Sequence, residues 1–196
     1  MLGQLATPSS VGIYAVAVKL SENWAFLVLT MTRSVTPHII EAKKISEELY
    51  YQRLQQICNL SAIIFYIVAI GLTFFATPLI VLFFGKNYAP AGIVLSIHIW
   101  SSIWMFFGNI KEVWIATEEL TGFALAASFL GAVMNISLNF WLIPIYQEVG
   151  AAIATVISYT FTDYIMCLIY PPARKFWWVM TKALALNIFT QRRAKA

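Results

Sequence analysis

Long runs of uncharged residues dominate the chain and predict its main elements. No charged residue occurs between Arg53 and Lys86, between Lys86 and Lys111, or between Glu119 and Glu148. Each interval exceeds the roughly 20 residues that an α-helix needs to cross about 30 Å of hydrocarbon. We therefore predict membrane-spanning helices at 57–84, 91–116 and 122–145.

Two further segments have the apolar pattern of a span but carry charges inside it. The segment 150–171 is apolar except for Asp163, and the segment 11–37 has apolar residues at helical spacing. Pro37 is expected to end the first of these helices, because proline lacks an N–H and clashes with the preceding turn. The pattern as a whole predicts an all-α, polytopic transmembrane helical bundle of about five spans.

Composition supports the bilayer as the solvent of this chain. Hydrophobic residues make up 60% of the sequence and charged residues only 11%, whereas a soluble domain carries about 25% charged residues. The net charge of +4 comes from clusters beside apolar runs and not from a polar face, which argues against nucleic-acid binding. Cys58 and Cys167 lie in apolar segments without metal-ligand spacing, so neither a disulfide nor a metal site is predicted, and no cofactor is implied.

Lysine and arginine residues set the expected orientation. They gather in the 38–56 linker and in the segment 172–196, whereas the opposite side has only Lys86. The positive-inside rule then places the C-terminus in the cytoplasm of a multi-pass protein in the cytoplasmic (inner) membrane. We expect 1–171 to form the transmembrane part, and 172–196 to form a basic amphipathic tail in the cytoplasmic interface.

Small and polar residues indicate how the last two spans pack. Gly150, Ala154 and Ser158 repeat every four residues and predict a smooth stripe for a close neighbour. A second face of the preceding span carries polar and small residues, namely Ser128, Gly131, Asn135 and Asn139. Its amides can bond to another helix or contact a substrate, and packing is favoured over substrate contact.

Ionisable residues inside spans are the most informative ones for function, because burying a charge in hydrocarbon is costly. Lys19 and Glu22 lie three residues apart, so they either pair with each other or line a polar cavity. Lys111 is expected to extend towards the cytoplasm, and Asp163 requires a partner from another helix. Asp163 then acts either as a structural hydrogen-bonding group or in ion coupling.

Other candidate groups point to structure more than to chemistry. His98, between apolar and aromatic neighbours, is interpreted as a satisfied core histidine. The sequence has no phosphate-binding loop, no HExxH motif and no GxSxG motif. An enzyme is therefore disfavoured.

Three segments resemble a known family in the right order and spacing. They are LNFWLIPIYQEVGAAIATVISY at 138–159, FFGKNYAPAG at 83–92 and MLGQLATPSSVGIYAVAVKLSE at 1–22. Together they are similar to the polysaccharide (O-antigen) flippases of the multidrug/oligosaccharidyl-lipid/polysaccharide exporter superfamily. Gln147 departs from the pattern, since the family usually has glycine after this tyrosine.

The resemblance covers only the second lobe of such a flippase, from the end of its seventh helix onward. It implies a C-terminal-lobe fragment in which Met1 is an internal methionine, working with a missing N-terminal lobe or a partner chain. The implied activity is export of a polyprenyl-diphosphate-linked oligosaccharide across the membrane by two lobes that alternately open to each side.

The resemblance also assigns hypothetical roles to the charged residues. Lys19 is the first candidate for contact with the diphosphate, Arg33 lies near the cytoplasmic entrance, and Glu22 limits binding or couples an ion. Lys111 and Asn139 complete the predicted substrate contacts, and Asp163 is the candidate for ion coupling.

Three alternatives to this function stay open. One is an antiporter of small organic cations from the same superfamily, which would need a net acidic cavity. The second is a non-transporting remnant or accessory subunit, because alternating access needs both lobes. The third, a membrane glycosyltransferase or ligase, would need a large catalytic loop, and the 38–56 linker is too short for one.

Overall fold

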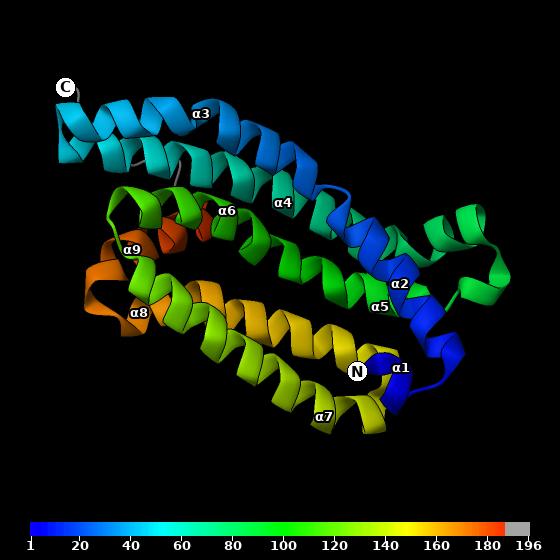
Figure 1. Cartoon of the computed structure of the whole chain (residues 1–196). Coiled ribbons are helices and arrows are strands. Elements are labelled where there is room, and N and C mark those ends of the chain that lie inside the picture. Colours follow the sequence, from blue (N-terminus) through cyan, green and yellow to red (C-terminus); the bar gives the residue numbers. More distant parts are fainter. Residues whose placement is uncertain (187–196) are drawn as a thin grey trace.

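The chain folds into a bundle of long helices, as the hydrophobic pattern predicts. The computed structural model describes residues 1–186, and these residues form helices and turns with no strand. Figure 1 shows the helices lying side by side, with α6 between the α3–α4 pair and α7. The elements are α1 (Leu2–Leu5), α2 (Pro8–Glu22), α3 (Ala25–Ile45), α4 (Glu47–Phe84), α5 (Ala91–His98), α6 (Ser102–Thr117), α7 (Thr121–Tyr159), a π-helix (Thr160–Ile165), α8 (Met166–Ile169) and α9 (Arg174–Leu184).

In the described part of the chain, three helices are long and apolar enough to cross a membrane. They cover Glu47–Phe84, Ala91–Thr117 and Thr121–Ile169. The first ends at the predicted residue and the second within one residue of it. Charge-free length is therefore a reliable guide to these helices, since only hydrocarbon or a protein core accommodates such runs.

The third long helix, α7, bends sharply at Gln147 into two arms that lie against each other (Figure 1). Gln147 has φ 50° and ψ −125°, a backbone conformation that favours glycine. Its side-chain Oε1 accepts a hydrogen bond of 2.8 Å from Ser10 Oγ. Gly150 follows the bend, and a Cβ at this position would overlap the backbone carbonyl of Leu142. The bend thus places the two predicted spans 122–145 and 150–171 next to each other.

The first predicted span, 11–37, is two helices in the structure, separated by a turn at Asn23 and Trp24, and it also differs at its end. Helix α2 ends at Glu22, and α3 then continues through Pro37 to Ile45. The expectation that Pro37 ends the helix is wrong, because an exposed proline removes only one hydrogen-bond donor and a long helix accommodates its ring.

The predicted 38–56 linker is also helical, apart from Ser46. The side chain of Ser46 caps α4 by accepting a hydrogen bond of 3.1 Å from the backbone N–H of Leu49. Glu47 and Glu48 follow in the first turn, where negative charge is favourable. As a result α3 and α4 form a tight antiparallel hairpin.

Helix α9 packs lengthwise on α4 and not flat across the end of the bundle. Its buried residues include Phe176, Met180 and Ala183, whereas Trp178 and Lys182 are exposed, so the helix is amphipathic. Hydrogen bonds join the two helices in the same order along both: Lys175 to Glu47, Gln55 to the carbonyl of Val179, and Tyr66 to the carbonyl of Leu184. The rest of the predicted tail, 187–196, lies outside the described residues.

Candidate functional site: the polar groove along α6

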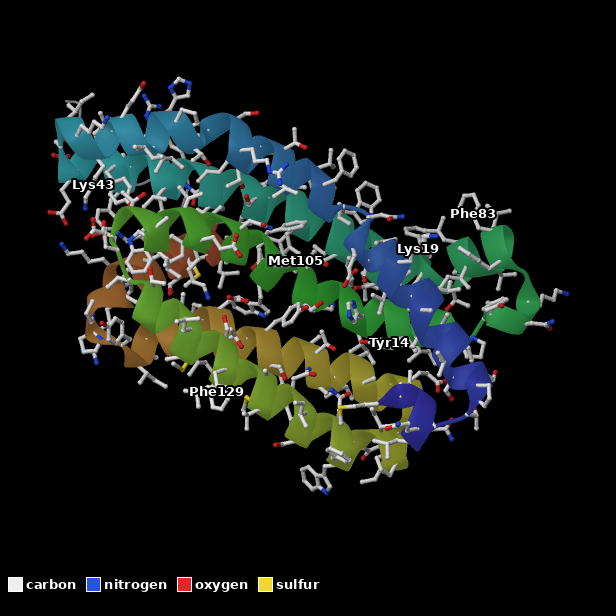
Figure 2. The ribbon with its side chains drawn as sticks, in the orientation of Figure 1. Tyr14, Lys19, Lys43, Phe83, Met105 and Phe129 are labelled. Carbon is white, nitrogen blue, oxygen red and sulfur yellow. The ribbon has the colours of Figure 1, made fainter. Side chains whose placement is uncertain are left out.

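One face of α6 is open between α3 and α7, and it carries most of the polar groups in the middle of the bundle. A hollow of about 590 Å³ lies between α3 and α6. A second hollow of about 290 Å³ lies between α6, α7 and the π-helix. We call the two together the α6 groove, because Glu112 lines both. Figure 2 marks Met105, which also lines it, on α6 between the α3–α4 hairpin and α7.

The residues of the α6 groove come from four elements. Thr36, Ile40, Lys43 and Lys44 come from α3, and Met105, Gly108, Asn109, Lys111, Glu112, Val113, Ile115, Ala116 and Thr117 come from α6. Ala124, Ser128 and Tyr159 come from α7, and Thr162 and Asp163 from the π-helix. The groove therefore combines both signs of charge with hydroxyl and amide groups.

A buried ion pair between Lys111 and Asp163 forms the centre of the second hollow. The two side chains are only 7% and 15% exposed, and the Lys111 ammonium also donates a hydrogen bond of 3.3 Å to the carbonyl of Thr162. The prediction that Lys111 extends to the cytoplasm is wrong, because a carboxylate within reach satisfies its charge inside the bundle. Asp163 does receive its partner from another helix, as expected.

The local backbone explains how Asp163 reaches α6. Asp163 lies in a π-helix, a wider turn that occurs frequently at functional sites. The first arm of α7 approaches it closely at Gly131, where a Cβ would overlap the side chain of Thr162. Gly108 on α6 faces the Asp163 carboxylate with ordinary van der Waals space for a Cβ, at 3.6 Å from Oδ1. Packing on one side and charge on the other hold the carboxylate in place.

The predicted polar face of α7 serves packing more than the groove. Asn135 Nδ2 donates to Ser158 Oγ at 3.3 Å, which joins the two arms of α7. Asn139 is buried and donates to the backbone carbonyl of Asn135 at 2.8 Å within its own arm. Ser128 lines the groove, but Asn139 does not. The predicted stripe of Gly150, Ala154 and Ser158 is buried, as expected for a close contact.

The other predicted site residues lie apart from the Lys111–Asp163 pair. Lys19 and Glu22 are exposed on α2, and the ion pairs within residues 1–186 do not include one between them. Arg33 is exposed on α3. Because Arg33 and Lys44 are eleven residues apart, they share one face of α3, and Lys44 places that face at the groove.

His98 is a satisfied core histidine, as predicted. It is 3% exposed, and its Nδ1 shares a hydrogen bond of 2.7 Å with Ser21 Oγ. This bond fixes α2 against the end of α5, so His98 stabilises the wall of the bundle and is not available to a ligand.

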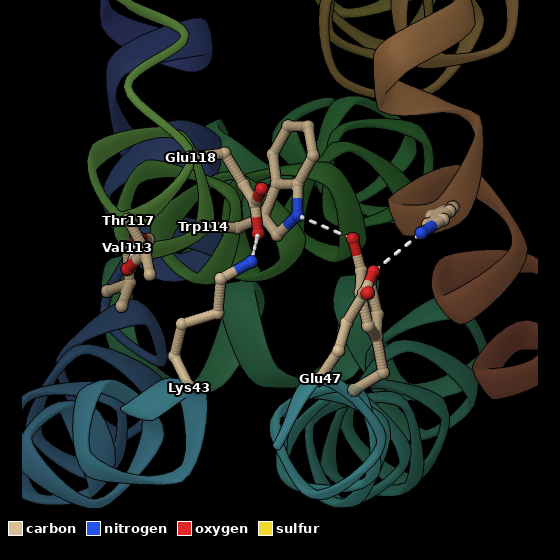
Figure 3. Close-up of polar contacts among 8 residues, drawn as sticks. Lys43, Glu47, Val113, Trp114, Thr117 and Glu118 are labelled. Atoms are coloured by element: carbon tan, nitrogen blue, oxygen red, sulfur yellow. Dashed lines mark hydrogen bonds and ion pairs between the residues drawn. The ribbon is translucent and has the colours of Figure 1, made fainter. Parts of the chain in front are cut away.

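A network of charged and aromatic groups lies at the end of α3 and the start of α4, and Figure 3 shows its polar contacts around Lys43, Glu47, Trp114 and Glu118. Lys43 forms an ion pair of 2.6 Å with Glu118, and its ammonium lies 4.7 Å from the centre of the Tyr50 ring. Trp114 Nε1 donates to the hydroxyl of Tyr51 at 3.4 Å. No sequence pattern indicated these contacts, because Lys43 and Glu118 lie 75 positions apart in the chain.

The same network extends to α9. Lys175 forms an ion pair of 2.5 Å with Glu47, and the ring of Phe176 stacks on Trp114 with centroids 5.2 Å apart. The hydrogen bond and charge of Glu47 raise the pKa of Lys175. Helices α3, α4, α6 and α9 are thus joined at this end of the bundle.

Comparisons with known proteins do not assign this arrangement to a family. No protein-family model, no curated protein and no solved structure matches the chain. The site is therefore defined by its own geometry: a groove with a buried ion pair, in a bundle of which three described helices are long and apolar enough to cross a membrane. That combination is typical of membrane proteins that move polar solutes or sense charge.

Proposed function

We propose that this chain forms one lobe of an alternating-access carrier that exports a lipid-linked oligosaccharide across the cytoplasmic membrane. The α6 groove is the observation that carries the proposal, because ionisable residues inside membrane-spanning helices mark substrate and ion pathways in many transporters. The three segments that resemble polysaccharide flippases point to the same cargo. The second lobe would come from a partner chain or from another part of a longer polypeptide.

The membrane topology in this proposal has five crossings. Helix α4 and the α5–α6 segment each supply one, and the two arms of α7 supply two more. The fifth is α2 with α3, of whose charged residues Lys43 and Lys44 line the groove. The positive-inside rule places the network of Lys43 and Lys175 in the cytoplasm, together with the C-terminus.

The physical problem that such a carrier solves is the polar headgroup, since a diphosphate and a sugar chain cannot cross hydrocarbon unaided. Arg33 and Lys44 are exposed cations on one face of α3, and Lys19 lies nearer the opposite end of the same wall. They offer successive contacts for the diphosphate, while the polyprenyl tail stays in lipid. Lys111 is unsuited to this task, because Asp163 already neutralises it.

A bacterial strain that lacks its own O-antigen flippase tests this function. The strain receives this chain together with the first lobe of a related flippase, and surface polysaccharide is measured on gels. We expect transport to return, and Lys19→Ala or Arg33→Ala to lower it at least tenfold. Lys86→Ala, in the loop at the opposite end of α4, is the matched control and should transport normally.

Two results would contradict the proposal. Absence of polysaccharide export, with both lobes present in the membrane, would reject the function and favour an accessory or remnant role. Full transport by Lys19→Ala and Arg33→Ala would keep the function but remove both cations from the site.

One structural observation favours a second candidate, an antiporter of small organic cations. Glu112 is exposed in the groove and forms no ion pair within residues 1–186, and of the three lysines that line the groove Lys43 and Lys111 are neutralised, which leaves Lys44 as the exposed cation beside it. An unpaired carboxylate in such a place attracts a cation. In the same strain, export of ethidium that is lost in Glu112→Gln would support this candidate over oligosaccharide export.

A further inference from the structure

A second kind of polar hollow lies on the α3–α4 hairpin, on a different face from the α6 groove. Its volume is about 440 Å³. The lining residues are Val35 and His38 from α3 and Arg53, Gln56, Ile57 and Leu60 from α4. The four residues of α4 form one helical stripe, because Gln56 and Ile57 both lie three or four positions from Arg53 and from Leu60.

The polar and apolar lining residues lie at two different levels. Since α3 and α4 are antiparallel and meet at Ser46, residues equally distant from Ser46 lie side by side. His38 and Arg53 are therefore nearly level with each other, within one residue, and Val35 is level with Ile57 about one turn farther from the hairpin end. The end of the hollow nearer Ser46 carries His38 and Arg53, and the end farther from Ser46 carries Val35, Ile57 and Leu60.

The sequence places the boundary between these two levels at the membrane surface. Arg53 is the last charged residue before the uncharged run that ends at Lys86. Below it, Leu60 is 46% exposed and opens onto the apolar outer face of α4. The hollow thus opens towards headgroups at one edge and towards hydrocarbon at the other.

Arg53 has hydrogen-bonding capacity to spare. Its Nη1 donates to Gln56 Oε1 at 3.2 Å, and it forms no ion pair in the part of the chain that the structure describes. His38 is less free, because its Nδ1 lies 3.8 Å from Glu41 Oε2. A guanidinium presents five donors in a planar fork, which matches the oxygens of a phosphate.

We propose that this hollow binds one anionic phospholipid, with its phosphate on Arg53 and an acyl chain over Val35, Ile57 and Leu60. A net anionic headgroup fits better than a zwitterionic one, because a choline ammonium would lie beside the guanidinium of Arg53, which has no carboxylate partner in the described residues. In the orientation proposed above the lipid belongs to the cytoplasmic leaflet. The binding itself does not depend on what the chain transports.

Native mass spectrometry of the full chain in detergent tests this site. Phosphatidylglycerol is the probe, phosphatidylcholine is the zwitterionic comparison, and inorganic phosphate is the soluble competitor. We expect Arg53→Ala to weaken phosphatidylglycerol binding at least tenfold. Lys44→Ala removes an exposed cation from the neighbouring face of α3 and should change binding less than twofold.

The remaining measurements separate this proposal from its alternatives. We expect phosphatidylcholine to bind at least tenfold more weakly than phosphatidylglycerol, and millimolar phosphate to leave the bound lipid in place. Unchanged phosphatidylglycerol binding in Arg53→Ala would overturn the proposal, as would equal losses in Arg53→Ala and Lys44→Ala. Displacement of the lipid by phosphate would show a site for soluble anions instead. Arg53 is exposed, so the variant should keep the thermal midpoint of the unmodified chain, which confirms that it folds.

Discussion

The buried pair of Lys111 and Asp163 makes the sharpest prediction about the stability of the bundle. Removing one partner of such a pair leaves an uncompensated charge in a poorly solvated place. We therefore expect Asp163→Ala to lower the free energy of unfolding, and the double variant Lys111→Met/Asp163→Ala to recover part of that loss. The recovery arises because the double variant leaves no unpaired charge.

The exposed fractions decide the expected size of the effect. Lys111 and Asp163 are 7% and 15% exposed, so solvent screens their charges little. A single replacement should cost about 3–5 kcal/mol. The Lys175–Glu47 pair is 66% and 58% exposed, so solvent screens its charges, and Glu47→Gln should lower stability far less than Asp163→Ala does.

Denaturant unfolding of the purified chain in detergent, followed by tryptophan fluorescence, measures these differences. The four variants of a double-mutant cycle give the interaction energy of the pair. A double variant that loses as much stability as the sum of both single variants would refute the reasoning. It would mean that the two charges are solvated independently and do not form a buried pair.

Three further predictions concern packing, backbone strain and pH. Gly131→Ala should destabilise the bundle by about 1–3 kcal/mol in denaturant unfolding, because the added methyl group would overlap Thr162 of the π-helix. Gly108→Ala has room for its methyl group and should cost less than half of that. Equal costs would contradict the packing argument. Gln147→Gly should be more stable than Gln147→Ala by about 1–3 kcal/mol in the same assay, because both lose the amide contact but only glycine relieves the positive φ; equal stability would exclude strain at the bend. The pKa of Lys175 is raised in the folded chain, so its ion pair with Glu47 stabilises the fold at neutral pH, and this contribution is lost as the pH rises through the folded-state pKa. In an NMR titration, Glu47→Gln should lower the pKa of Lys175. An unchanged pKa would contradict the assignment of the shift to Glu47.

The long helices follow from the sequence because the physics behind them is local. The uncharged run after Arg53 ends in a helix terminus at Phe84, and the turn between the last two spans falls at Gln147, between the predicted ends 145 and 150. The length of a hydrophobic segment depends only on residues that are neighbours in the chain. The long helices can therefore be predicted without knowledge of tertiary contacts.

The groove could not be predicted to the same depth, because its contacts join distant residues. The sequence marked Lys111 and Asp163 as costly charges, but their pairing depends on how α6 meets the π-helix. At Pro37 the error was of the opposite kind. A local rule predicted a helix end there, but the surrounding structure keeps α3 helical through this residue. The roles of Lys19, Glu22 and Arg33 stay predictions, because all three are exposed and only a functional assay reads their contacts.

The wide turn at Thr160–Ile165 sets the rotational phase of everything that follows it. Ser158 and Met166 are both buried, although eight residues of regular α-helix would drift by about 80°. Deleting a single residue from this turn would rotate the following segment by about 100° relative to the preceding one. Either the carboxylate of Asp163 would move away from the ammonium of Lys111, or the buried thiol of Cys167 would turn outward. This segment thus tolerates a change of side chain more readily than a change of length.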